Sequence, residues 1–149
     1  MAHLPNSASE PSSKSSNKLS GNHPSGEASL RSIQFLTLFP ELIEPTLNAS
    51  LLGKASEKKL LEFGITQIRD FATDKHRTVD DTPYGGGEGM LLRVDVLHAA
   101  WSAVVNRPQA PQGLRRRTIL MSPQGPLLTQ AKAKELVHSY EELVLVCGH

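Results

Sequence analysis

The sequence predicts an α/β fold in which a mostly parallel sheet is flanked by helices. Strand-forming apolar runs alternate with helical periodicities along the chain, and three of the runs are almost continuously apolar. Alternating strands and helices imply right-handed crossovers and parallel strands. Continuous apolar runs suit strands that are covered on both faces of the sheet. Because ligands of such sheets bind outside the carboxyl ends of the strands, the loops that follow the strands are candidate sites.

The first 30 of the 149 residues differ in composition from the rest. They are rich in Ser, with Asn, Pro and Gly, and they include no aromatic residue. Such a segment buries too little apolar surface to offset the entropy lost on ordering. We therefore expect a disordered tail at residues 1–30 and the folded part at residues 31–149. A transit peptide is a weaker interpretation, because the tail has no Arg and carries Glu10 and Glu27.

Charge and composition exclude several classes of protein. The formal net charge is +1, so any RNA contact must come from a local patch. Cys147 is the only cysteine, which excludes an internal disulfide and a Cys-rich zinc site. No His, Cys, Asp or Glu set has metal-ligand spacing, and no apolar run reaches the roughly 18 residues of a membrane helix. We expect a cytoplasmic protein with no metal site and no membrane partner.

In the first half of the folded part, the sequence predicts two strands with a helical segment between them. Residues 32–39 are a short apolar run of strand formers. Residues 41–60 are expected to form one or two short helices, whose boundaries Pro45 and Gly53 leave open. Residues 63–68 are expected to form the second strand, although the glycine at position 64 could instead cap a helix.

A long polar loop at residues 70–90 separates these elements from the second half. A helix of about 12 residues follows it, since apolar side chains recur there at helical spacing. They are Leu97, Ala100, Trp101, Val104 and Val105. Residues 118–121 and 143–146 are expected to be strands. Between them Thr129 is an N-cap candidate for a helix with the apolar face Ala133, Leu136, Val137 and Tyr140.

Small-residue turns follow the last two strands, at residues 122–125 and 147–149. The rule for parallel sheets places a ligand site beside these turns. Cys147 is interpreted as a buried structural thiol, because no nearby feature supplies an activating base. Arg115, Arg116 and Arg117 are interpreted as a solvated strand entrance, with contact to RNA phosphates as the alternative.

The densest functional signal lies in the long loop, at residues 74–90. Its glycines allow close approach of the backbone to a ligand and can turn amide groups toward an anion. Lys75, His76 and Arg77 can contact phosphate, and Tyr84 can stack on a base. A flexible loop with a solvated charge cluster is the other interpretation. The loop lacks the Gly-Lys-Ser/Thr ending of a Walker loop and the spacing of the Rossmann fingerprint.

Four motifs in the folded part carry a resemblance to a known family. They are Leu38-Phe39-Pro40-Glu41, Arg69-Asp70-Phe71, the loop from His76 to Met90, and Leu120-Met121-Ser122-Pro123-Gln124-Gly125 with Leu145-Val146-Cys147-Gly148-His149. Through them residues 33–149 resemble the N-terminal part of bacterial tRNA (guanine-N1)-methyltransferases, which belong to the knotted SPOUT class. The first 30 residues have no counterpart in that family.

The resemblance implies a function, a cofactor and partners. Members transfer the methyl group of S-adenosylmethionine to N1 of the tRNA guanosine 3′ of the anticodon, at position 37, and work as homodimers. The residues expected to line the cofactor are Leu120, Met121, Ser122, Pro123 and Gly148. The residues expected to meet tRNA are His76, Arg77, Asp81, Tyr84, Gly85, Gly86 and Gly87.

The resemblance also implies that the catalytic residue is absent from these 149 residues. N1 of guanine bears a proton that a general base must remove, and the family's base is an Asp with no counterpart here. The cofactor-binding trefoil knot would likewise be truncated before it is complete. We expect this chain alone to be inactive in methyl transfer.

Two alternatives belong to other functional classes. The chain could be a catalytically silent module that binds tRNA or dimerises, and its tRNA binding would then depend on salt and on Arg77. It could also be another nucleotide-binding α/β enzyme, which would bind ATP and not S-adenosylmethionine.

Overall fold

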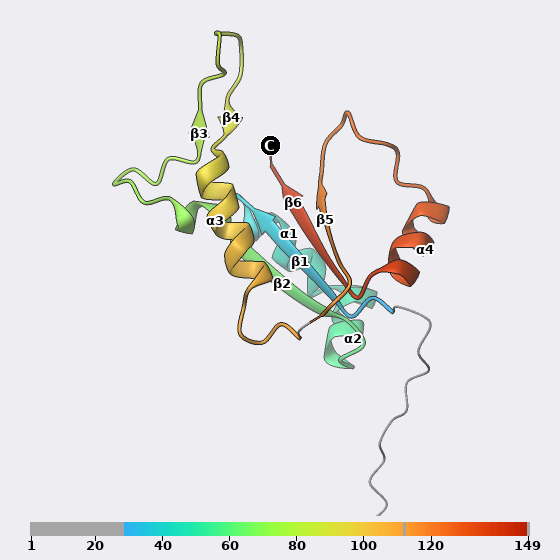
Figure 1. Cartoon of the computed structure of the whole chain (residues 1–149). Helices are drawn as coiled ribbons and strands as arrows, with labels where there is room; N and C mark the ends of the chain where they lie inside the picture. The colour runs from blue at the N-terminus through green and yellow to red at the C-terminus, as the bar shows by residue number, and fades with distance from the viewer. Residues whose placement is uncertain (1–28, 112, 149) are drawn as a thin grey trace, which may run out of the picture.

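A four-stranded parallel sheet forms the centre of the protein in a computed structural model that describes residues 29–111 and 113–148 (Figure 1). The strand order is β2-β1-β6-β5. The elements, in chain order, are β1 Ser32–Thr37, α1 Pro40–Leu47, α2 Ser50–Glu57, β2 Glu62–Gln67, the 3-10 helix η1 Ile68–Phe71, β3 Asp80–Asp81, β4 Leu91–Leu92, α3 Val94–Val105, β5 Arg116–Leu120, α4 Gln130–Ser139 and β6 Glu142–Cys147. The predicted α/β class with a mostly parallel sheet and flanking helices is confirmed. Most of the predicted tail, residues 1–28, lies outside the described residues.

The two central strands, β1 and β6, are the most buried ones. In both of them every residue is buried or half-buried, as continuous apolar runs predict. The same prediction is wrong for the edge strand β5, where three of the five residues are exposed. Ser32 lies level with Glu62 on one side and with Glu142 on the other. The strands therefore start together at one edge of the sheet and end together at the opposite edge.

One core cluster joins the sheet to α3. Leu36 and Val144 from the central strands are fully buried there, together with Ile68 of η1 and Ala100 of α3. Figure 1 shows α3 in front of the sheet and α1 behind it. The predicted apolar face of α3 is confirmed, since Leu97, Trp101 and Val105 also pack against this cluster. The helix starts at Val94, three residues before the predicted apolar positions.

Two glycines have packing roles that the sequence left open. Gly64 lies inside β2 and does not cap a helix, and a Cβ built on it would lie 1.9 Å from Oε1 of the buried Gln34. Gly53 lies inside α2, where an added Cβ would lie 2.5 Å from the carbonyl oxygen of Asn48. Both glycines therefore permit close approaches between neighbouring segments.

The long loop contains structure that the sequence analysis missed. η1 occupies its start, and the two-residue strands β3 and β4 pair antiparallel through Asp80 with Leu92 and Asp81 with Leu91. Val79 is buried in the core cluster beside this pair. We call residues 80–92 the arm; it projects away from the sheet above α3 (Figure 1).

The predicted N-cap of α4 is confirmed, because the Thr129 hydroxyl accepts a hydrogen bond from the amide of Lys132 at 3.2 Å. Leu136 is the buried residue of this helix, whereas Val137 is exposed. β5 begins at Arg116, two residues before the predicted strand. Among the described residues, no helix is long and apolar enough to cross a membrane.

Candidate functional site

The strand ends that lead into the two predicted ligand turns lie side by side at the carboxyl edge of the sheet. β5 and β6 are neighbours, and Leu120 is in register with Val146. The pairing continues one step past β5, where the amide of Met121 donates to the carbonyl of Val146 at 2.9 Å. The next residues turn sharply, since the amide of Gly125 donates to the carbonyl of Ser122 at 3.2 Å. The structure therefore places Leu120 and Met121, which lead into the first turn, beside Val146 near the end of β6.

All five residues of the predicted cofactor set are exposed at this edge. Leu120 is 65% exposed and Met121 is 50% exposed, so the end of the edge strand β5 presents apolar surface. At Gly148 an added Cβ would meet no heavy atom within 4 Å, so open space surrounds this position. Whether these residues bind a cofactor stays a prediction.

An apolar hollow of about 430 Å³ adjoins Leu120. It lies between α3 and the β5–β6 pair, and its lining residues are Val94, Leu97, His98, Trp101, Thr118, Leu120 and Val146. Trp101 closes one side, since its indole Nε1 donates to the hydroxyl of Thr118 at 2.9 Å. The hollow gives the edge an apolar surface that a flat planar group can contact.

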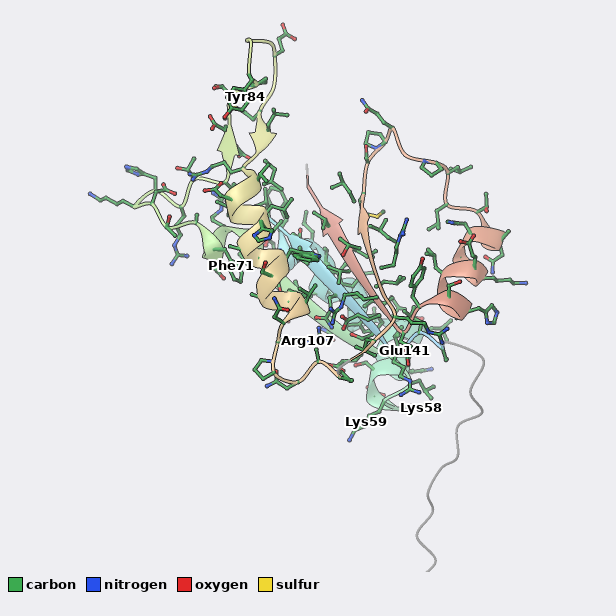
Figure 2. All side chains as sticks on the ribbon, in the orientation of Figure 1. Lys58, Lys59, Phe71, Tyr84, Arg107 and Glu141 are labelled. Atoms are coloured by element: carbon green, nitrogen blue, oxygen red, sulfur yellow. The ribbon has the colours of Figure 1, made fainter. Side chains whose placement is uncertain are left out.

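The predicted RNA-binding residues lie in two places, in the arm and in the turn directly before it. Tyr84 is fully exposed near the tip (Figure 2). Gly85, Gly86 and Gly87 follow it with positive φ angles of 86°, 79° and 138°. Only glycine adopts such angles readily, so the run of glycines is required by the shape of the tip. Asp81 lies on β3, where its carboxylate accepts from the amide of Thr82 at 2.8 Å.

His76 and Arg77 lie in an exposed turn before the arm. Arg77 has a left-handed φ of 51°, and its guanidinium donates to Asp70 at 3.2 Å. The carbonyl of Arg77 in turn accepts from the guanidinium of Arg69 at 3.3 Å. The turn is therefore ordered by side-chain contacts, which favours a functional loop over a flexible one.

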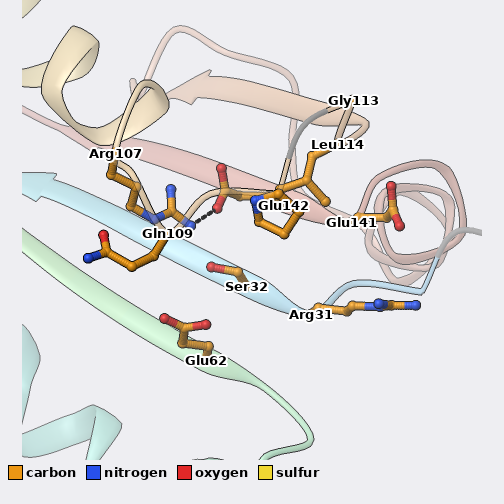
Figure 3. A pocket seen from close by; sticks show the side chains of 10 residues that line it. Arg31, Ser32, Glu62, Arg107, Gln109, Gly113, Leu114, Glu141 and Glu142 are labelled. Atoms are coloured by element: carbon orange, nitrogen blue, oxygen red, sulfur yellow. Dashed lines mark hydrogen bonds and ion pairs between the residues drawn. The ribbon is translucent and has the colours of Figure 1, made fainter.

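The opposite edge of the sheet holds a buried charge cluster that the sequence analysis missed. The Glu142 side chain is 0% exposed, and one of its oxygens accepts from the guanidinium of Arg107 (Figure 3). The other oxygen accepts from the guanidinium of Arg116. Burial on its own raises the pKa of Glu142, but the hydrogen bonds and charges of the two arginines outweigh it and the pKa is lowered. The solvated-entrance interpretation is therefore wrong for Arg116, although Arg115 and Arg117 are exposed.

Cys147 is half-buried at the end of β6, less buried than expected for a core thiol. Burial nevertheless raises the pKa of this thiol, which leaves it protonated and inert at neutral pH. Within residues 29–111 and 113–148, no group of three or more His, Cys, Asp and Glu side chains is placed to hold a metal ion.

A family comparison matches nearly all of the folded part. Residues 31–149 match the family model described as "tRNA (Guanine-1)-methyltransferase TrmD". The chain belongs to the tRNA (guanine-1)-methyltransferase family. The resemblance that the four motifs carry is thereby confirmed at the level of the family, and both the arm and the two turns lie within the matched residues.

Individual members of the tRNA (guanine-1)-methyltransferase family match at high identity. The chain is 49% identical over 114 residues to a tRNA (guanine-N(1)-)-methyltransferase of Nostoc punctiforme, covering 76% of this chain and 45% of that protein. It is 49% identical over 116 residues to the enzyme of the same name from Myxococcus xanthus, covering 78% and 45%. The chain thus spans about half the length of the curated relatives it matches.

A solved structure shares the fold. The crystal structure of tRNA (m1G37) methyltransferase from Aquifex aeolicus superposes with a TM-score of 0.67 at 28% identity, covering 81% of this chain and 51% of that one. The described sheet and its helices therefore have the architecture of a SPOUT methyltransferase. The truncated knot stays a prediction.

Proposed function

We propose that this chain serves methyl transfer from S-adenosylmethionine to N1 of the guanosine 3′ of the tRNA anticodon. One observation carries the proposal: the ends of β5 and β6, which lead into the turn at residues 122–125 and into the exposed Gly148, lie side by side at the carboxyl edge of a parallel sheet. In Figure 1 the arm projects from the same edge. One edge of the sheet would then present both a cofactor site and an RNA-binding surface.

The residues of the two turns fit S-adenosylmethionine chemically. Leu120 and Met121 offer exposed apolar surface to the faces of the adenine ring. Ser122 offers a hydroxyl group to polar parts of the cofactor, Pro123 offers a rigid apolar wall, and open space at Gly148 allows close approach of the backbone. The cofactor supplies an electrophilic methyl group when bound. These five residues would hold and orient it.

The arm and the turn before it fit tRNA. His76 and Arg77 are exposed and can contact phosphates, and Tyr84 is fully exposed for stacking on an unpaired base. Asp81 can accept hydrogen bonds from base edges or from the 2′-hydroxyl of ribose. The backbone of the glycine run Gly85, Gly86 and Gly87 can approach the RNA closely.

The general base for the N1 proton is not assigned to any residue of this chain. By the family resemblance this base is an Asp that has no counterpart among the matched residues. We further propose a homodimer and a cytoplasmic location, as for a tRNA-modifying enzyme.

Cofactor binding is tested by titration calorimetry of the purified chain with S-adenosylmethionine. Leu120→Ala and Gly148→Leu are expected to weaken binding roughly tenfold, the first by removing contact area and the second by filling open space. Leu128→Ala is the matched control, because Leu128 lies in the loop after β5, is 65% exposed like Leu120, and is outside the predicted site. Equal affinity of all variants would reject the assigned cofactor site.

A tRNA-binding measurement separates the enzyme from its alternative. Salt-dependent tRNA binding that Arg77→Ala weakens, without any S-adenosylmethionine binding, would support the silent tRNA-binding module. Binding of ATP but not of S-adenosylmethionine would support a different nucleotide-binding enzyme. Methyl transfer by the chain alone would contradict the expectation that its general base lies elsewhere.

A further inference from the structure

Besides the contacts of Arg77 with Asp70 and Arg69, one further carboxylate organises the turn that carries His76 and Arg77, that of Asp74. Its oxygens accept from the amide of His76 at 3.1 Å, from the amide of Thr78 at 3.0 Å and from the hydroxyl of Thr78 at 2.8 Å. The backbone carbonyl of Asp74 also accepts from the amide of Arg77 at 3.0 Å. Asp74 therefore contacts each of the three residues from 76 to 78.

The conformation that Asp74 holds is one the chain does not favour by itself. Arg77 has a φ of 51°, in the left-handed region that non-glycine residues seldom adopt. Without the Asp74 contacts, the segment would sample other conformations, and the backbone positions of residues 75–77 would no longer be fixed.

Asp74 also ties the turn to the foot of the arm. Its carboxylate lies 3.8 Å from the guanidinium of Arg93, and Arg93 pairs with Asp95 in the first turn of α3 at 2.6 Å. The amide of Arg93 donates to the carbonyl of Val79 at 2.7 Å, directly before β3. The turn, the arm and α3 are thus linked through the side chains of Asp74 and Arg93.

We propose that Asp74 is a positioning residue for tRNA recognition, holding Lys75, His76 and Arg77 in one fixed display without contacting the RNA itself. This inference rests on the proposed function, since it assumes that the turn meets tRNA. Its physical basis is preorganisation: side chains that are already ordered lose less entropy when they bind phosphates.

The sign of the effect distinguishes positioning from simple electrostatics. Removal of a carboxylate beside three basic side chains strengthens the attraction to phosphates if charge alone matters. Removal of an organising residue weakens binding, because the basic side chains must then be ordered by the RNA. The two mechanisms therefore predict opposite changes for the same substitution.

The experiment measures tRNA affinity of the full chain by filter binding across a salt series. Asp74→Ala is expected to weaken binding roughly tenfold, although it makes the protein more basic. The charge-matched control is Glu57→Ala, which removes an exposed carboxylate of α2 outside the arm and the turn and is expected to bind equally well or more tightly. Asp74→Ala binding as tightly as the unsubstituted chain, or more tightly, overturns the proposal.

A second pair of variants tests the proposal in case Asp74→Ala does not fold. Thr78→Val removes the hydroxyl that donates to Asp74 while it keeps the size of the side chain, and Thr78→Ser keeps that hydroxyl. We expect Thr78→Val to weaken tRNA binding and Thr78→Ser to bind tRNA as tightly as the unsubstituted chain. Both variants are expected to have the same melting temperature. Equal tRNA affinity of the two variants contradicts the proposal.

Failure of the proposed function gives a different result from failure of this inference. If the unsubstituted chain does not bind tRNA at low salt, RNA binding itself is rejected and the positioning role is rejected with it. If the unsubstituted chain binds and Asp74→Ala and Thr78→Val bind equally well, only the positioning role is rejected.

Discussion

The two ends of the β5–β6 strand pair are built in opposite ways. At the amino end Glu142 is completely buried, with its carboxylate between the guanidinium groups of Arg107 and Arg116. At the carboxyl end Leu120 is 65% exposed and Met121 is 50% exposed, where they lead into the turns of the predicted cofactor site. Charge is thus buried at one end of the pair, while apolar surface is exposed at the other.

This contrast separates the part that fixes the strands from the part that meets ligands. Arg107 comes from the segment after α3 and Arg116 from β5, so Glu142 of β6 joins three segments at one point. Arg107 also donates to the carbonyl of Val104 at 2.9 Å, which anchors the end of α3. The amino end can therefore define the positions of β5 and β6, and the carboxyl end is left free of that constraint.

The largest expected effect comes from breaking the buried charge cluster. Glu142→Gln keeps the shape of the side chain but leaves two guanidinium groups without their counter-charge, so we expect a loss of about 3–5 kcal/mol in the free energy of unfolding. Glu141→Gln, a substitution in the less buried neighbour, is expected to cost less than about 1 kcal/mol. Urea denaturation of both variants measures the difference. Equal stabilities would show that the cluster does not fix the amino end.

The pH dependence of stability is a second test of the buried charge cluster at the amino end of the β5–β6 pair. The pKa of Glu142 is lowered from its ordinary value of 4.5, because the arginine contacts outweigh burial. A carboxyl with a lowered folded pKa contributes stability that is fully present above its unfolded pKa and is lost as the pH falls through its folded pKa.

The stability gap between the unsubstituted chain and Glu142→Gln is therefore expected to be widest above pH 4.5 and to narrow below it. Urea denaturation at a series of pH values measures this gap. A gap that stays constant from neutral to acidic pH would contradict the lowered pKa.

The placement of the turn residues at the carboxyl end is predictable from the sequence, whereas the buried charge cluster at the amino end is not. Turns of small residues after apolar runs, together with the rule for parallel sheets, indicate residues 122–125 and 147–149 as a ligand site. The arginines around Glu142 give a misleading signal, because runs of charge are usually solvated. A pairing between residues 35 positions apart, such as Arg107 with Glu142, leaves no local pattern. The one hint is a Glu directly before the apolar run of β6.

The structure of the arm is also only partly predictable from the sequence. Its Gly run and basic residues predict a functional loop, and the positive φ angles of Gly85, Gly86 and Gly87 agree with that prediction. The pairing of β3 with β4 involves only two residues in each strand, too few to leave a period in the sequence. The role of Asp74 is also missed, since an Asp in a polar loop looks like a solvated charge until its hydrogen bonds are known.

The smallest expected effect is on stability at the exposed carboxyl end. Leu120→Ala removes an apolar side chain that is largely exposed already, so little buried area is lost and the free energy of unfolding should change by less than about 0.5 kcal/mol. Leu36→Ala, which truncates a fully buried leucine, is the control and should cost about 2–5 kcal/mol. Thermal and urea denaturation compare the two variants. A large loss for Leu120→Ala would mean that this leucine supports the fold, and the carboxyl end would then not be the ligand-facing end that its exposure indicates.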